Sequence, residues 1–238
     1  MEIIFVRHGQ STQNIANSNN TTYDPNNVSL TKLGETQAET TGEYLKKFGK
    51  YDAIFSSPLL RAISTSNIIK NKLNFKNNII VNNRLKEHNL GILEGLKEDD
   101  VNEYINKNKQ LITLLKRVDD EPNLYKKYKL NEKFTNMYFE YVKSTLTYKD
   151  QLKNAKSFLN FIKKQNYKRI LVVSHGGIMD VISSIICNTN VYNQDIKIVL
   201  NNPDKKIYSG NCDVMGVLLE NNKFSLVIPR NNMHVQNL

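Results

Sequence analysis

The chain has 238 residues, 39% of them hydrophobic, and a formal net charge of +10 at pH 7. This length suits one α/β domain with an insertion, and the hydrophobic content excludes a chain that is disordered by composition. The positive charge fits acidic partners such as phosphorylated metabolites, phosphoproteins or nucleic acid, although a solvated Lys-rich surface is the simpler explanation. Basic residues are not interleaved with aromatics as in a nucleic-acid platform, so nucleic-acid binding is not expected.

The N-terminal region predicts a strand, a loop and a helix. Residues 2–6 are short, β-branched and apolar, which indicates a buried strand. Residues 11–29 are rich in Asn, Ser and Thr and predict a loop with little regular structure. A helix is then expected from the N-cap Thr31 to about Phe48, with Gly49 as its stop.

A second strand–helix unit follows. Residues 52–56 predict a strand, and Pro58 stands near the start of a helix, where its missing N–H is tolerated. A third short strand is expected at residues 79–81. The core face of the helix would hold four aliphatic residues: Leu59, Ile63, Ile68 and Ile69.

Residues 96–150 interrupt this alternation with a charged, helix-forming stretch that contains no strand–helix repeat. We expect a mainly helical insertion that packs over the sheet edge and acts as a lid on a single domain spanning residues 1–238. Residues 151–166 predict a further helix with one apolar face, formed by Leu152, Ala155, Leu159 and Ile162.

The C-terminal part contains the clearest central strand, residues 169–174, which Gly176 and Gly177 connect to a helix ending near Cys187. Residues 213–220 and 223–228 predict a hairpin. Alternating strands and helices predict an α/β fold: a three-layer α/β/α sandwich around a mostly parallel sheet.

Two cysteines, Cys187 and Cys212, lie in apolar stretches and form no CxxC pair. They predict buried free thiols in a reducing compartment, with no disulfide and no zinc site. The chain begins with a strand-like run and shows no signal-peptide pattern, and its most apolar stretch contains His175 and Asp180. We therefore expect a cytoplasmic protein without a membrane span.

Two histidines share a setting that favours chemistry. His8 follows the strand at residues 2–6, and His175 follows the strand at residues 169–174. In open α/β sheets, ligands bind at the carboxyl ends of the strands. A single histidine there is often structural, but two in matched settings, each beside glycine, favour a functional site.

Two arginines and a carboxylic acid also lie at or after the ends of predicted strands. Arg7 precedes His8, and Arg61 follows the strand at residues 52–56. Guanidinium groups suit phosphate oxygens because they bind bidentately and stay charged. Glu87, after the short third strand, could protonate a departing oxygen, and we expect desolvation and nearby anionic charge to raise its pKa.

Together these stretches resemble the histidine phosphatase superfamily, in its phosphoglycerate-mutase-like branch. Arg7-His8-Gly9-Gln10-Ser11-x-x-Asn14 resembles its first motif, and Ser56-Ser57-Pro58-Leu59-Leu60-Arg61-Ala62 with Thr65 resembles its second. Leu85-x-Glu87-x-x-x-Gly91-x-x-Glu94-Gly95 resembles the acid-bearing loop, and Val173-Ser174-His175-Gly176-Gly177 the second histidine motif. Asn211 and Asn231-Asn232-x-His234 are similar to its C-terminal strand region.

The resemblance implies roles for these residues. His8 would attack phosphorus and become a phosphohistidine, and Glu87 would act as acid and then as base. His175 would stabilise the phosphoryl group, which Arg7, Asn14, Arg61 and Gly176 would help to bind. No metal or other cofactor is implied, because arginines and histidine supply the positive charge.

The family contains both phosphatases and mutases. Mutases usually carry Arg and Tyr after the acid, where this chain has His88 and Leu90. That difference favours hydrolysis of a phosphomonoester, from a small metabolite or a phosphoprotein. Lys116-Arg117 lies about where a mutase places an Arg pair, so a phosphoglycerate mutase stays an alternative, as does an inactive phosphate-binding or interaction module.

Overall fold

The computed structural model describes residues 1–144, 146–188 and 210–238. Within them a six-stranded sheet has the order β3-β2-β4-β1-β5-β6. Strands β3, β2, β4 and β1 pair in parallel, and β5 and β6 add an antiparallel hairpin beside β1. The predicted α/β fold is confirmed. The strands are β1 (Glu2–Arg7), β2 (Ala53–Ser56), β3 (Ile80–Val81), β4 (Arg169–Ser174), β5 (Val214–Glu220) and β6 (Lys223–Asn231).

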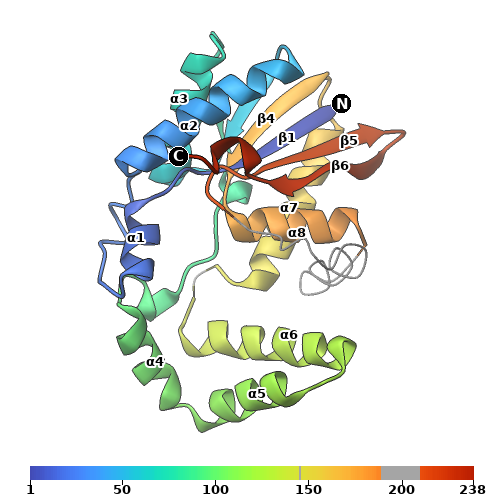
Figure 1. Cartoon of the computed structure of the whole chain (residues 1–238). Coiled ribbons are helices and arrows are strands. Elements are labelled where there is room, and N and C mark those ends of the chain that lie inside the picture. The colour runs from blue at the N-terminus through green and yellow to red at the C-terminus, as the bar shows by residue number, and fades with distance from the viewer. Residues whose placement is uncertain (145, 189–209) are drawn as a thin grey trace.

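Helices cover both faces of this sheet (Figure 1). On one face, α2 (Lys32–Leu45) and α3 (Leu60–Lys72) share a core with Ile4 and Val6 of β1. On the other, α7 (Tyr148–Lys163) and α8 (Gly176–Ile186) share a core with Ile3 and Phe5. Because successive strand side chains point to opposite faces, one apolar run fills both cores. These are the three predicted layers.

A short helix, α1 (Thr12–Ser18), occupies the first part of the loop expected at residues 11–29, and residues 19–29 have no helix or strand, as predicted. The Ser11 hydroxyl accepts the N–H of Asn14 at 3.4 Å, and Asn14 Oδ1 accepts the N–H of Ser11 at 3.0 Å. Ser and Asn are poor interior helix formers, but this reciprocal capping box satisfies the amides of the first turn. The loop prediction was wrong for residues 12–18 because composition does not reveal such pairing.

The sequence predicted the start of α2 and the stop at Gly49 correctly, but it predicted the buried face of α3 only in part. The Thr31 hydroxyl caps α2, and the 3-10 turn after it ends at Gly49, whose φ is 88°. In α3 the buried face includes Arg61 and Thr65 beside Ile69. Polar residues take core positions there because this face borders the sheet's carboxyl edge. The other expected core residues are only half-buried: Leu59, Ile63 and Ile68.

The insertion is mainly helical, as expected. It forms α4 (Glu98–Asn106), α5 (Lys109–Asp120) and α6 (Leu124–Tyr141). Figure 1 shows α5 and α6 side by side, apart from the strands, and α6 also packs against α7. The pair buries apolar residues of its own, so it does not lie mainly on the sheet edge: Leu111, Leu114, Val118 and Phe139. Its action as a lid stays a prediction.

Two remaining expectations concern the thiols and the membrane. Cys212 is buried, but Cys187 is exposed because it lies at the C-cap of α8, beyond the last helical turn. Both are free. No helix among the described residues is long and apolar enough to cross a bilayer.

Candidate active site

Two histidines meet at the carboxyl ends of β1 and β4. These strands pair in parallel with Arg7 opposite Ser174, so His8 and His175 follow at neighbouring positions. Their ring centroids are 5.1 Å apart, and their exposed fractions are 4% and 0%. Sequence alone placed each histidine after a strand, and the strand pairing brings them together.

The ring of His8 is held through both nitrogens. Its Nδ1 lies 2.8 Å from the carbonyl oxygen of Gly9, which requires Nδ1 to carry the proton. Its Nε2 accepts the Nε–H of Arg61 at 3.3 Å. Burial, then the charges of His175, Arg61 and Arg7, lowers the pKa of His8 well below 6.5. The ring is therefore neutral at pH 7, with a lone pair on Nε2.

Arg61 reaches His8 from the first turn of α3. Its side chain is 9% exposed, and burial is the main cause that lowers its pKa. Thr65, one turn later, links this helix to the histidine loop, because its hydroxyl donates to the Arg61 carbonyl at 2.8 Å and accepts the Gly9 N–H at 3.1 Å. A Cβ on Gly9 would lie 2.3 Å from the carbonyl oxygen of Gly34, so only glycine fits this approach.

His175 is oriented by Ser57, a residue for which sequence reasoning gave no role. The Ser57 hydroxyl lies 2.8 Å from Nε2 of His175 and also accepts the N–H of Leu59 at 3.3 Å. A serine that accepts there can donate its own proton to Nε2, which leaves the ring proton on Nδ1. Nδ1 is buried and has no hydrogen-bond partner in the described structure. Burial, then the charge of Arg61, lowers the pKa of His175 to about 3.

Glu87 points its carboxylate at the start of α8. Its Oε2 accepts the N–H of Gly177 at 2.8 Å, and its Oε1 accepts a short hydrogen bond from Gln151 of α7. Burial opposes its ionisation, but the hydrogen bond and charge of His88, the charge of His175 and the Gly177 N–H together lower its pKa far below 4.5. The expected upward shift of the Glu87 pKa is therefore wrong in this structure, because cationic and N–H partners outweigh desolvation.

The remaining predicted residues lie around His8. Arg7 ends β1, and Asn14, in α1, accepts a hydrogen bond from Asn211 at 3.0 Å through Oδ1. Asn211 also donates to the His8 carbonyl at 3.3 Å. Asn211 thus connects the segment before β5 to α1 and to the histidine loop.

Gly176, the first residue of α8, is held by a residue that sequence reasoning missed. Its carbonyl accepts from Arg230 of β6 at 3.3 Å. Arg230 also forms ion pairs with Asp213, at 2.7 Å, and with Asp180. Arg230 is distant in sequence from the histidine motifs. Its contact with Gly176 could therefore be found only from the tertiary structure. His234 lies elsewhere, stacked on Tyr44 of α2 with ring centroids 4.3 Å apart.

The profile of the histidine phosphatase superfamily (branch 1) matches residues 3–202, a stretch that contains His8, Arg61, Glu87 and His175. The chain belongs to this superfamily. Over 101 residues it is 41% identical to a 2,3-bisphosphoglycerate-dependent phosphoglycerate mutase from Cytophaga hutchinsonii, a match that covers 42% of this chain and 46% of the mutase. The chain therefore aligns with less than half the length of that relative.

Two further proteins align over nearly the whole chain. A Hydrogenobacter thermophilus protein, provisionally named phosphoserine phosphatase 2, is 27% identical over 99% of this chain and 98% of its own length. The structure of a phosphoserine phosphatase mutant from Entamoeba histolytica, in complex with phosphoserine, has a TM-score of 0.64 at 20% identity and covers 98% of both chains. This structural likeness confirms the superfamily fold.

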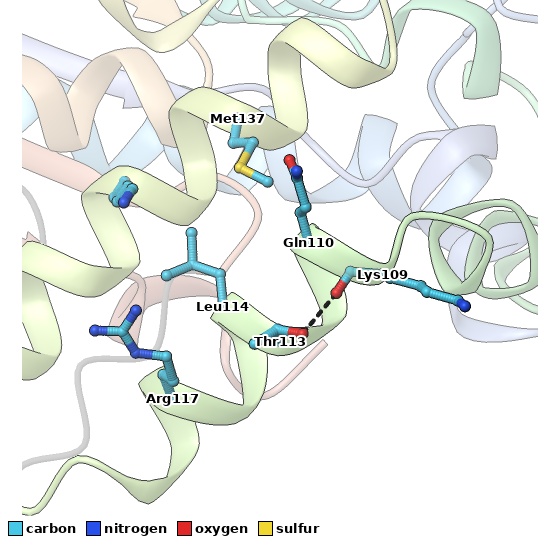
Figure 2. A pocket seen from close by; sticks show the side chains of 7 residues that line it. Lys109, Gln110, Thr113, Leu114, Arg117 and Met137 are labelled. Carbon is cyan, nitrogen blue, oxygen red and sulfur yellow. Dashed lines mark hydrogen bonds between the residues drawn. The ribbon is translucent and has the colours of Figure 1, made fainter.

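The basic pair Lys116-Arg117 lies outside the histidine site of this superfamily member. Both side chains are exposed on α5. Arg117 borders a surface pocket of about 360 Å³ between α5 and α6, whose lining comes from those two helices alone (Figure 2). Residues 1–144, 146–188 and 210–238 contain no group of three or more His, Cys, Asp or Glu that could hold a metal ion. Metal-independent action stays a prediction.

Proposed function

We propose that this protein is a phosphatase that hydrolyses a small phosphorylated metabolite through a phosphohistidine on His8. The observation that carries the proposal is the state of the His8 ring: buried and neutral, with Nδ1 bound to the Gly9 carbonyl and Nε2 directed at Arg61. A neutral imidazole with an oriented lone pair is an activated nucleophile.

In the first step, Nε2 of His8 attacks phosphorus and the bond to the leaving oxygen breaks. Glu87 gives that oxygen a proton, and the Nδ1–H to the Gly9 carbonyl steadies the charge that develops on the ring. In the second step, water attacks the phosphohistidine, Glu87 takes the water proton, and the P–N bond breaks. Phosphate leaves, and His8 is again neutral.

The phosphoryl oxygens would be bound by donors that lie around His8. Arg61 would turn from Nε2 of His8 to an oxygen, because a phosphoryl dianion attracts a guanidinium more strongly than a neutral nitrogen does. Nδ1 of His175, buried without a partner, would gain one. Arg7 and Asn14 lie beside His8 in the same motif, and the N–H of Gly176 would add a donor at the helix N-terminus of α8, where the N–H of Gly177 already donates to Glu87.

Phosphatase is preferred to mutase because the Arg and Tyr that the mutase pattern carries after the acid are replaced in this sequence. His88 and Leu90 stand where the mutase pattern has Arg and Tyr. Lys116 and Arg117 are exposed on a helix outside the histidine site. A phosphoprotein substrate is compatible with the same chemistry. The two free cysteines fit a reducing, cytoplasmic location.

The test is turnover of p-nitrophenyl phosphate, phosphoserine and 3-phosphoglycerate in chelator by the wild type and by His8→Ala. We expect phosphate release without added metal, and its loss in His8→Ala. Conversion of 3-phosphoglycerate to its isomer without phosphate release would instead establish a mutase. Release that persists in His8→Ala would exclude His8 as the nucleophile.

A further inference from the structure

Glu87 and His88 form a closely coupled pair at the acid-bearing loop. The Nδ1 of His88 lies 3.1 Å from Oε1 of Glu87 and 3.3 Å from Oε1 of Gln151. The side chain of Glu87 is 15% exposed and that of His88 is 34% exposed. His88 is therefore the member of the pair that reaches solvent more readily.

The pair is fixed from three elements. From α7, Gln151 contacts both members, donating to Glu87 and accepting at His88. From α6, Phe139 meets the His88 ring edge to face, with centroids 5.2 Å apart. From α8, a Cβ on Gly177 would lie 2.6 Å from Oε1 of Glu87 and 3.1 Å from Nδ1 of His88, so glycine permits the approach. The His88 ring is therefore held within ion-pair distance of the Glu87 carboxylate, and the backbone N–H of His88 also donates to Oε1 of Glu87 at 3.1 Å.

The proposed phosphatase chemistry requires a proton on Glu87, yet the groups around Glu87 favour its anion. Its partners lower the pKa of Glu87, while the hydrogen bond and charge of Glu87, aided by Gln151 and Glu94, raise the pKa of His88 despite burial. The proton of the pair therefore belongs to His88 before substrate binds. Of the groups that face His88, Glu87 and Glu94 are acidic, His175 is basic, and Gln151 and Phe139 are uncharged.

We propose that His88 stores the proton that Glu87 delivers to the leaving group, an inference that rests on the proposed phosphatase function. When a phosphoryl dianion binds, its charge favours a neutral carboxyl beside it. The Nδ1–H bond of His88 then breaks, an O–H bond forms on Glu87, and His88 becomes neutral. After the second step, the water proton taken by Glu87 returns to Nδ1 as phosphate leaves.

If His88 stores the proton, it affects how turnover depends on pH, whereas a purely structural His88 would not. The pair loses its proton only when the pH rises above the pKa of His88, which is raised. The pH at which turnover falls on the alkaline side therefore depends on His88 and not on Glu87 alone. Removing the imidazole should lower that pH for alkyl phosphates, whose leaving oxygens need a proton. Aryl phosphates need little protonation and should be affected much less.

The test compares His88→Gln with the wild type on phosphoserine and p-nitrophenyl phosphate across pH, with added imidazole. His234→Gln, far from the pair, is the matched control. We expect kcat/KM for phosphoserine to fall about ten- to a hundredfold at pH 7, the alkaline limb to move to lower pH, and imidazole to restore part of the rate. For p-nitrophenyl phosphate the change should stay within about threefold.

Equal losses on both substrates, or an alkaline limb that does not move, would overturn the storage role and leave His88 as a packing residue. Glu87→Gln is measured in parallel to separate this result from failure of the underlying mechanism. If Glu87→Gln loses phosphoserine turnover and His88→Gln does not, only the storage role fails. If Glu87→Gln also keeps its turnover, the acid role in the proposed function fails as well.

Discussion

Two arginines, Arg61 and Arg117, lie in very different surroundings. One is buried beside the histidines, and the other is exposed on the insertion. Arg61, at the start of α3, is 9% exposed and donates to Nε2 of His8. Arg117, in the last turn of α5, is exposed and borders a pocket formed within the insertion. The first guanidinium has lost most of its water and is held against a neutral ring. The second keeps its hydration, so its charge is screened.

The comparison extends to the regions around them. At the sheet edge, burial and specific neighbours shift pKa values. Burial is the largest cause that lowers the pKa of His8 and of His175, and His88 and Gly177 help to lower that of Glu87. In the insertion, Lys109, Arg117 and Lys133 surround an apolar floor of Leu114 and Met137. Concentrated, desolvated polarity is typical of catalytic sites, and scattered surface charge is not.

The largest expected effect comes from the acid. Glu87→Gln keeps the size of the side chain but removes its proton chemistry, so phosphoserine turnover should fall about 10²- to 10⁴-fold. Turnover of p-nitrophenyl phosphate should fall much less, because its leaving group is stable as an anion. Steady-state kinetics on both substrates measure the difference. Equal losses would remove Glu87 from the acid role.

The two arginines give a matched pair of substitutions. Arg61→Met should lower kcat/KM about 10²- to 10³-fold, because a donor to the phosphoryl oxygens is lost from a desolvated site. Arg117→Met and Lys116→Met should stay within about twofold, as expected for solvated charges. A large loss in either insertion variant would contradict the separation of the two regions and favour a clamp over the substrate.

A smaller effect is expected from the residue that orients His175. Ser57→Ala removes the hydroxyl 2.8 Å from Nε2, so the ring loses its preferred tautomer. We expect kcat to fall about tenfold, with binding of p-nitrophenyl phosphate less affected. Ser57→Thr, which keeps the hydroxyl, should retain more activity than Ser57→Ala. An unchanged kcat in Ser57→Ala would show that backbone packing alone orients the ring.

A last effect concerns folding stability and not turnover. The pKa of His175 is about 3 in the folded protein, below its ordinary 6.5, so the folded state binds fewer protons than the unfolded one. Stability is therefore fully present above pH 6.5 and is lost as pH falls toward 3, by up to about 1.4 kcal/mol per pH unit. Urea unfolding at several pH values measures this slope. His175→Asn should flatten it, and an unchanged slope would assign the acid loss to other groups.

Sequence reasoning predicted the layers well because they depend on local periodicity. The continuous apolar runs of β1 and β4 and the amphipathic stretch of α7 each indicate an element without knowledge of its neighbours. It failed at α1, where the Ser11–Asn14 capping box overrides composition. It also predicted a purely aliphatic buried face for α3, whereas that face includes Arg61 and Thr65.

The same division applies to the candidate site. Sequence by itself determined which chemical groups are available at the strand ends, since motif spacing places His8, Arg61, Glu87 and His175 after predicted elements. Only the tertiary structure decided their protonation and orientation, because groups from distant segments take part. Ser57 orients His175, and Gln151 of α7 and Gly177 of α8 hold the carboxylate of Glu87. A pKa depends on burial and on charges across space, and neither can be read from the order of residues along the chain.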